Sequence, residues 1–239
     1  MWLSWASPPK FLEKTRQLWK ILGVMGGVFM VLGLYLGLAV APVDAQQGEV
    51  YRVLYVHVPA AWMSMFLYMV ACVYAGLNWV YRGSVSAVMM RALLPTGAWM
   101  TVLALVTGAL WGKPTWGTYW VWDARMTSEL LLLFIYLGLM ALSQLSLDAS
   151  KSDRVLAIGL LIGAVNIPLI YGSVVFWNTL HQGYSVSLSG SRLHPDIARA
   201  LVLCLLGFWL CCASTVLNRA RHALLSRRAM QATLQGVST

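Results

Sequence analysis

Apolar residues along this chain gather in six long runs that are separated by short polar stretches. Each run has about the twenty residues that an α-helix needs to cross ~30 Å of hydrocarbon. The runs cover residues 21–41, 55–81, 92–110, 126–147, 155–175 and 197–217. The pattern therefore predicts an all-α integral membrane protein with six transmembrane helices, forming a single polytopic membrane domain over residues 1–239.

Helix-breaking residues interrupt two of these runs. Because Pro suits the first turn of a helix, Pro59 predicts that the second span begins near His57. Asn166 and Pro168 interrupt the fifth run, and a breaker at membrane depth is tolerated where neighbouring helices satisfy the freed carbonyl. That interruption is either a kink or a site.

The first run follows a basic segment, as a secretory signal peptide would. Its apolar part is longer than the ~7–15 residues of a secretory h-region, although residues 43–45 loosely imitate a cleavage site. We interpret it as an uncleaved first span.

The composition agrees with a membrane protein, since 59% of residues are hydrophobic, 10% are charged and the mean hydropathy is +0.70. The cysteines lie inside apolar runs without a C-x-x-C pair, which argues against a disulfide framework or a zinc site. They are Cys72, Cys204, Cys211 and Cys212. The formal net charge of +9 comes from short clusters between the runs, so it reflects orientation in the bilayer rather than nucleic-acid binding.

The Lys and Arg residues divide unequally between the two sides of the membrane. Twelve fall in the N-terminal segment, the 82–91 loop, the 151–154 loop and the C-terminal tail. The other side has five: Arg52, Lys113, Arg125, Arg192 and Arg199. By the positive-inside rule both termini are cytoplasmic, and the segment between the third and fourth helices lies on the outer face.

That segment, residues 111–125, reads WGKPTWGTYWVWDAR and concentrates large rings as no other part of the chain does. Because Gly112, Pro114 and Gly117 punctuate it, we predict a loop with short turns rather than a continuous helix. The rings are Trp111, Trp116, Tyr119, Trp120 and Trp122. An aromatic belt is one interpretation, but so many rings in one loop would expose an apolar patch of several hundred Å², a size typical of binding surfaces.

Two histidines, His57 and His181, fall on the same side as this loop. Two neutral imidazoles with large rings between them suit a planar, largely apolar metal cofactor, with a nitrogen on each face of an iron porphyrin. The two porphyrin carboxylates would need cations, and Arg52 and Arg125 are candidates, with snorkelling to lipid phosphates as the alternative for each. Asp123 either steers Arg125 or caps the fourth helix.

Three motifs carry a resemblance to a known family. The 111–125 segment looks like the WWD signature of haem-handling membrane proteins of cytochrome c maturation, and HVPAAW at 57–62 and WNTLHQG at 177–183 are similar to the CcmC family. The family commonly has Trp where Phe176 precedes Trp177 here.

The resemblance implies noncovalent haem b on the periplasmic side of the bacterial inner membrane, with His57 and His181 as axial ligands. It implies that the WWD loop is the platform and that haem passes to the chaperone CcmE, without enzymatic turnover. Implied partners are the ABC-type subunits CcmA and CcmB, the small protein CcmD and membrane lipid. The chain has no P-loop, so any ATP dependence would come from another chain.

Two other functions remain open at this point. One is a membrane subunit that transfers electrons through a bis-His haem, and the other is a permease for another solute. The permease predicts polar residues at mid-membrane positions, and the spans offer few, chiefly Asn78, Glu129 and Asn166.

Overall fold

A computed structural model describes residues 7–144, 148–177, 181, 186–187, 190–191 and 193–237. The α-helices are α1 (Pro8–Tyr35), α2 (Leu54–Tyr81), α3 (Ser84–Trp116), α4 (Ala124–Leu142), α5 (Ala149–Gly163), α6 (Asn166–Phe176) and α7 (Pro195–Val237). A π-helical turn, η2 (Leu36–Val40), ends α1, and a 3₁₀ turn, η3 (Glu49–Val53), precedes α2. Two short strands, β1 (Val186–Ser187) and β2 (Gly190–Ser191), pair in antiparallel fashion.

Within the part of the chain that the structure describes, six helical segments are long and apolar enough to cross a membrane. They are Pro8–Val40, Glu49–Tyr81, Ser84–Trp116, Ala124–Leu142, Ser150–Ser173 and Pro195–Thr233. The predicted fold class, an all-α multi-pass membrane protein with six spans, is confirmed.

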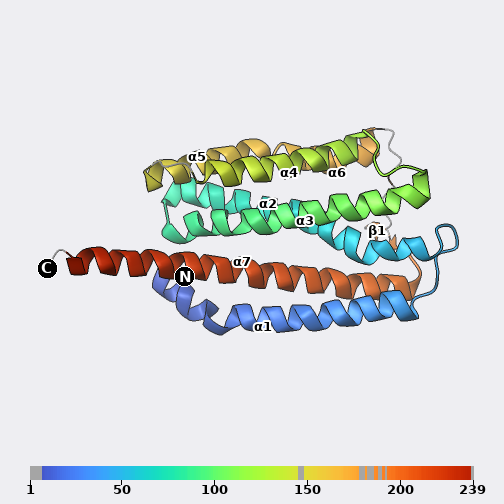
Figure 1. The fold of residues 1–239 in the computed structure, drawn as a ribbon, viewed down its shortest axis with the longest axis horizontal. Coiled ribbons are helices and arrows are strands. Elements are labelled where there is room, and N and C mark those ends of the chain that lie inside the picture. The colour runs from blue at the N-terminus through green and yellow to red at the C-terminus, as the bar shows by residue number, and fades with distance from the viewer. Residues whose placement is uncertain are drawn as a thin grey trace.

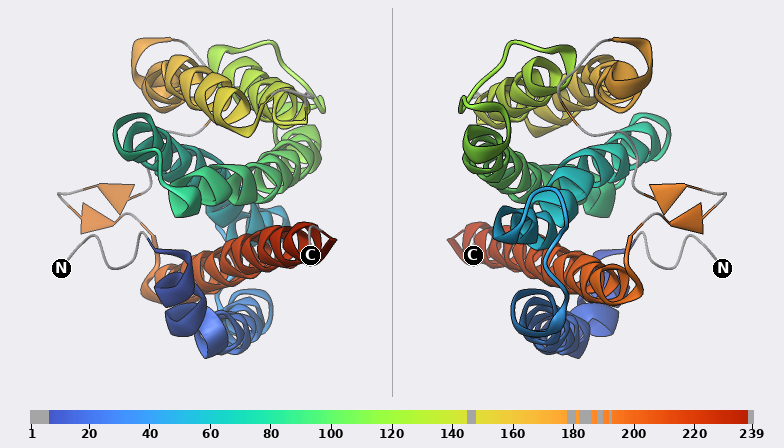
Figure 2. Two further views of the ribbon diagram at one scale, coloured as in Figure 1. Left: turned by 90° about the vertical axis from the view of Figure 1, so that its left-hand side faces the viewer. Right: turned by 90° about the vertical axis from the view of Figure 1, so that its right-hand side faces the viewer.

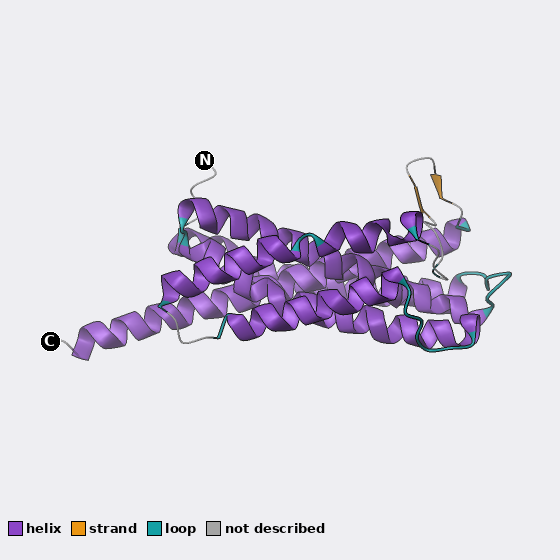
Figure 3. Ribbon diagram, turned by 90° about the horizontal axis from the view of Figure 1, so that it is seen from above, coloured by secondary structure: helices purple, strands orange, loops and turns teal. Residues whose placement is uncertain are grey.

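The helices lie lengthwise beside one another in three layers (Figures 1 and 2). One outer layer pairs α1 with α7, the middle layer pairs α2 with α3, and α4 lies with α5 and α6 in the other outer layer. Both termini lie toward the same end of the bundle, as an even number of spans requires (Figure 3). The loop between α3 and α4 lies at the opposite end.

Small residues let α1 and α7 approach closely. A Cβ added at Gly26 or Gly33 of α1 would lie 2.7 Å from the Sγ of Cys211 or Cys204, respectively. Packing of this kind is typical of helix pairs in membranes, where lipid offers no hydrophobic driving force. All four cysteines are free thiols.

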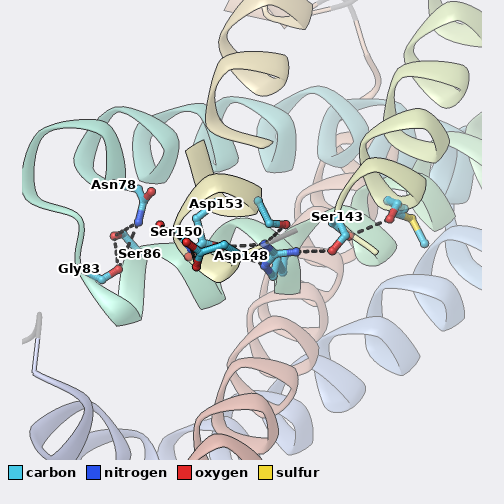
Figure 4. A network of polar contacts seen from close by, with 10 residues as sticks. Asn78, Gly83, Ser86, Ser143, Asp148, Ser150 and Asp153 are labelled. Carbon is cyan, nitrogen blue, oxygen red and sulfur yellow. Dashed lines mark hydrogen bonds and ion pairs between the residues drawn. The ribbon is translucent and has the colours of Figure 1, made fainter. Parts of the chain in front are cut away.

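Polar contacts fasten the helix connections at the end where the termini lie (Figure 4). The guanidinium of Arg91 in α3 donates to Asp153 Oδ1 at 2.7 Å, to Ser152 Oγ at 2.9 Å and to the Ser143 carbonyl at 2.6 Å. Beside this network, Asn78 Nδ2 donates to Ser86 Oγ at 3.2 Å across the α2–α3 turn. These contacts hold the α2–α3 and α4–α5 connections in place.

The ends of two predicted spans differ from the structure, and the interruption predicted in the fifth span is a kink. The second helix begins at Leu54 rather than near His57, because η3 runs directly into α2, and Pro59 lies inside the helix. The fourth helix ends at Leu142, and residues 145–147 of the predicted span lie outside the described residues. The fifth span is a kinked pair, α5 and α6, in which Asn166 Nδ2 donates to the Ser128 carbonyl of α4 at 2.9 Å.

The largest correction concerns the aromatic segment. Its first six residues continue α3 to Trp116, and only residues 117–123 form the connection to α4. A proline in a helix removes one hydrogen bond and bends the helix without having to end it, and Pro114 does not end α3. Gly117 ends it instead, with a φ of 79° that favours glycine.

Candidate functional site

His57 lies in the first turn of α2, and its side chain is buried. Its Nδ1 is 3.1 Å from the Ala104 carbonyl and 3.1 Å from Thr107 Oγ1, both on α3. A carbonyl can only accept, and the Thr107 hydroxyl donates to the Leu103 carbonyl at 2.6 Å, so Nδ1 must carry the proton. The lone pair of Nε2 is then available to a metal, as in histidines whose other nitrogen is held by a carbonyl.

One face of α3 is shaped to receive this ring. Ala104, Thr107, Gly108 and Trp111 follow the spacing of a single helix face. A Cβ at Gly108 would lie 3.0 Å from His57 Cε1, so the glycine leaves room for the imidazole. Trp111 meets the His57 ring edge-on, with centroids 5.6 Å apart and an interplanar angle of 84°.

Trp111 is itself fixed by the segment that follows α1. Its Nε1 donates to Gln47 Oε1 at 2.7 Å, and the Tyr51 ring meets it edge-on at 5.8 Å. The Gln47 backbone N–H donates in turn to Asp44 Oδ1 at 2.8 Å, within a turn built on that aspartate. Trp111 therefore forms a rigid wall beside His57.

His181 lies opposite His57, although the two are far apart in the sequence. Their ring centroids are 6.0 Å apart with an interplanar angle of 29°, and Trp116 lies 6.1 Å from the His181 ring. Residues 178–180 and 182–183 of the WNTLHQG motif lie outside the described residues. The structure thus brings together both histidines, Trp111 and Trp116.

The 6.0 Å between the two ring centroids is the spacing expected of two imidazoles on one metal ion, and the rings themselves are stacked. A metal–imidazole bond is about 2 Å long and the ring centroid lies about 1 Å behind the nitrogen, so two axial imidazoles have centroids about 6 Å apart. Within the described part of the chain no three His, Cys, Asp or Glu residues gather as a metal site.

The two candidate arginines differ in what they contact. Arg125, half-buried in the first turn of α4, interacts electrostatically with His57, and its guanidinium makes no hydrogen bond or ion pair with a described residue. Arg52 pairs with Glu49, and its Nη1 donates to the carbonyls of Gly37 and Ala41 in and after η2. Arg125 therefore keeps its guanidinium donors unpaired among the described residues, whereas Arg52 holds the end of α1.

The remaining predicted residues lie in or after the 117–123 loop. Tyr119 is 56% exposed and Trp122 is 75% exposed, whereas Trp120 is half-buried with its ring edge-on to Trp122 at 5.3 Å. Asp123 caps α4, since its Oδ1 accepts from the Met126 N–H at 2.8 Å. The prediction of a cap at Asp123 is confirmed.

Sequence reasoning missed the residues that orient His57 and Trp111. Ala104, Thr107 and Gly108 show a helical period, but nothing in the sequence aligns α3 with α2. The sequence did not identify Gln47 as a partner of Trp111, because a single glutamine in a loop is common and does not by itself indicate a role.

Comparison with known proteins gives independent information. Residues 1–235 match the model of a family described as "Heme exporter protein C". Heme exporter protein C of Bradyrhizobium diazoefficiens is 42% identical over 93% of this chain and 85% of its own length, and that of Escherichia coli strain K12 is 42% identical over 92% and 89%. A "Putative cytochrome c biosynthesis ccmC-like mitochondrial protein" of Marchantia polymorpha is 41% identical over 82% of this chain and 83% of its own. The resemblance inferred from the three motifs is confirmed.

Proposed function

The chain belongs to the heme exporter protein C family, and on this premise we propose that it binds haem and presents it at the outer face of the bacterial inner membrane. It holds haem b noncovalently, facing the periplasm, and delivers it to the haem chaperone CcmE during cytochrome c maturation. It works in a complex with the ABC-type subunits CcmA and CcmB and with CcmD. Its role is transfer without chemical turnover.

The observation that carries this proposal is the opposed pair of imidazoles. The rings of His57 and His181 are stacked with their centroids 6.0 Å apart, and the contacts of Nδ1 leave Nε2 of His57 free to ligate. Haem bound here would supply an iron for two nitrogens and two carboxylates for cations.

Each part of the site has a distinct task in this proposal. The α3 face orients His57, while Trp111 and Trp116 pack against the ligand and exclude water. Arg125 neutralises a carboxylate, and Arg52 contributes less because most of its donors have partners. Tyr119 and Trp122, which are exposed, form the open edge of the site, from which a docked partner can take the ligand.

The orientation rests on charge. Of the seventeen Lys and Arg residues, twelve belong to the N-terminal segment, the 82–91 and 151–154 loops and the C-terminal tail, and five belong to the segments that alternate with these along the chain. This distribution supports cytoplasmic termini and a periplasmic site.

The test is the haem content of the purified protein. Protein from haem-replete cells should give a pyridine haemochrome of b type that is extracted by acid-acetone, because the chain has no C-x-x-C-H attachment motif. Absence of haem in several detergents would contradict the proposal.

A further inference from the structure

Among the described residues, the indole N–H of Trp120 is a buried donor without an acceptor. A buried Trp N–H usually finds a hydrogen-bond partner, and leaving one unpaired costs about 1–3 kcal/mol. A Phe at position 120 could pack in the same place without an unpaired donor, so packing alone does not require this free-energy cost.

The indole is also held in place by its neighbours. The Thr118 hydroxyl donates to the Trp120 carbonyl at 3.1 Å, and the Trp122 ring lies edge-on to Trp120 at an interplanar angle of 75°. These contacts fix both the backbone and the ring. A hydrogen-bond acceptor for the Trp120 N–H would therefore have to be supplied by a bound ligand.

The surroundings indicate the charge of that acceptor. Trp120 lies in the connection that leads directly into α4, where the guanidinium of Arg125 makes no hydrogen bond or ion pair with a described residue. Two donors without acceptors within six consecutive residues suit an anion, and hydrogen bonds to a charged acceptor are roughly twice as strong as neutral ones.

We infer that Trp120 donates its indole N–H to a carboxylate of the bound porphyrin, so that this ring selects for a ligand with free carboxylates as well as packing against it. The inference rests on the proposed function. It distinguishes Trp120 from Trp111, whose indole N–H already donates to Gln47.

A comparison of two ligands tests the inference. Haem b and its dimethyl ester, in which both carboxylates are blocked, are titrated into apo protein and followed by the porphyrin absorption band. In Trp120→Phe, the affinity for haem should fall about tenfold and the affinity for the ester should fall less. The loss of ring area weakens both ligands equally, whereas a carboxylate loses a stronger hydrogen bond than an ester carbonyl does. Trp99→Phe removes an indole from an exposed position on α3 and should bind both ligands as wild type does.

A second readout needs no substitution at Trp120. With ¹⁵N-labelled indoles, diamagnetic zinc protoporphyrin should shift the Trp120 N–H resonance of the wild-type protein strongly, and its dimethyl ester, whose neutral ester carbonyls are weaker acceptors, should shift it less. Equal losses of haem and ester affinity in Trp120→Phe together with equal shifts from both zinc ligands would overturn the inference, as would no loss at all. Failure of wild type to bind either iron porphyrin would instead overturn the proposed function.

Discussion

Arg91 and Arg125 are half-buried arginines at opposite ends of the bundle, and they differ in what their guanidinium groups contact. Arg91 donates to Asp153, Ser152 and the Ser143 carbonyl, in the network shown in Figure 4. Arg125 makes no hydrogen bond or ion pair with a described residue. A guanidinium whose hydrogen bonds are satisfied stabilises the fold, whereas one without such partners near His57 is available to a ligand.

Arg52 lies between these extremes. It is on the same side as Arg125, yet Glu49 and two main-chain carbonyls occupy most of its donors. The side of the membrane on which an arginine lies therefore does not identify it as a binding cation. The partners that its guanidinium already has are what distinguish Arg52 from Arg125.

The largest expected effect is on stability, at Arg91. Arg91→Ala leaves the Asp153 carboxylate, whose side chain is 17% exposed, without its cation, which should lower the free energy of unfolding by about 3–5 kcal/mol. Thermal unfolding in detergent would measure this, and the haem affinity of the protein that remains folded should not change. Arg125→Ala in the apo protein is the control, and an equal loss of stability there would remove the distinction between the two arginines.

The next effect is on haem binding, at Arg125. Arg125→Ala should weaken binding by about 1–3 kcal/mol, because a carboxylate in a partly desolvated site loses its partner. Arg125→Lys should fall between Ala and wild type, since Lys keeps the charge but lacks the planar fork. Titration of apo protein with haem measures the order.

The same substitutions at Arg52 test whether the two arginines differ in their contribution to haem binding. Arg52→Ala should weaken haem binding less than Arg125→Ala does. Unchanged binding in all these variants would mean that the carboxylates find other partners; Lys113 is then the first candidate, and Arg192 lies outside the described residues.

A smaller effect is expected at Gly108. In Gly108→Ala the added methyl lies 3.0 Å from His57 Cε1, so the ring must move by a few tenths of an ångström, and haem affinity should fall a few-fold. Gly76→Ala in α2 is the control, because its methyl would meet nothing within 4 Å and Ala favours a helix over Gly by about 1 kcal/mol. Equal haem affinity in the two variants would show that α3 does not set the position of His57.

The sequence was informative where a single segment determines the outcome. Apolar length predicted six spans, and the residue types around 111–125 pointed to the candidate site. It failed where contacts between segments decide: the path of α3 through Pro114, the contact of Thr107 with His57, and the pairing of Arg52 with carbonyls of η2. Periodicity describes one helix at a time, whereas register between helices depends on packing.

The most direct test of the account is the axial ligation of bound haem. Wild-type protein should give the low-spin spectrum of two nitrogen ligands by electron paramagnetic resonance and absorption. His57→Ala and His181→Ala should each lose it, whereas Trp116→Ala should keep the low-spin signature of the haem that remains and mainly lower the occupancy. A low-spin spectrum that is unchanged in either histidine variant would contradict the claim that the two imidazoles share one iron.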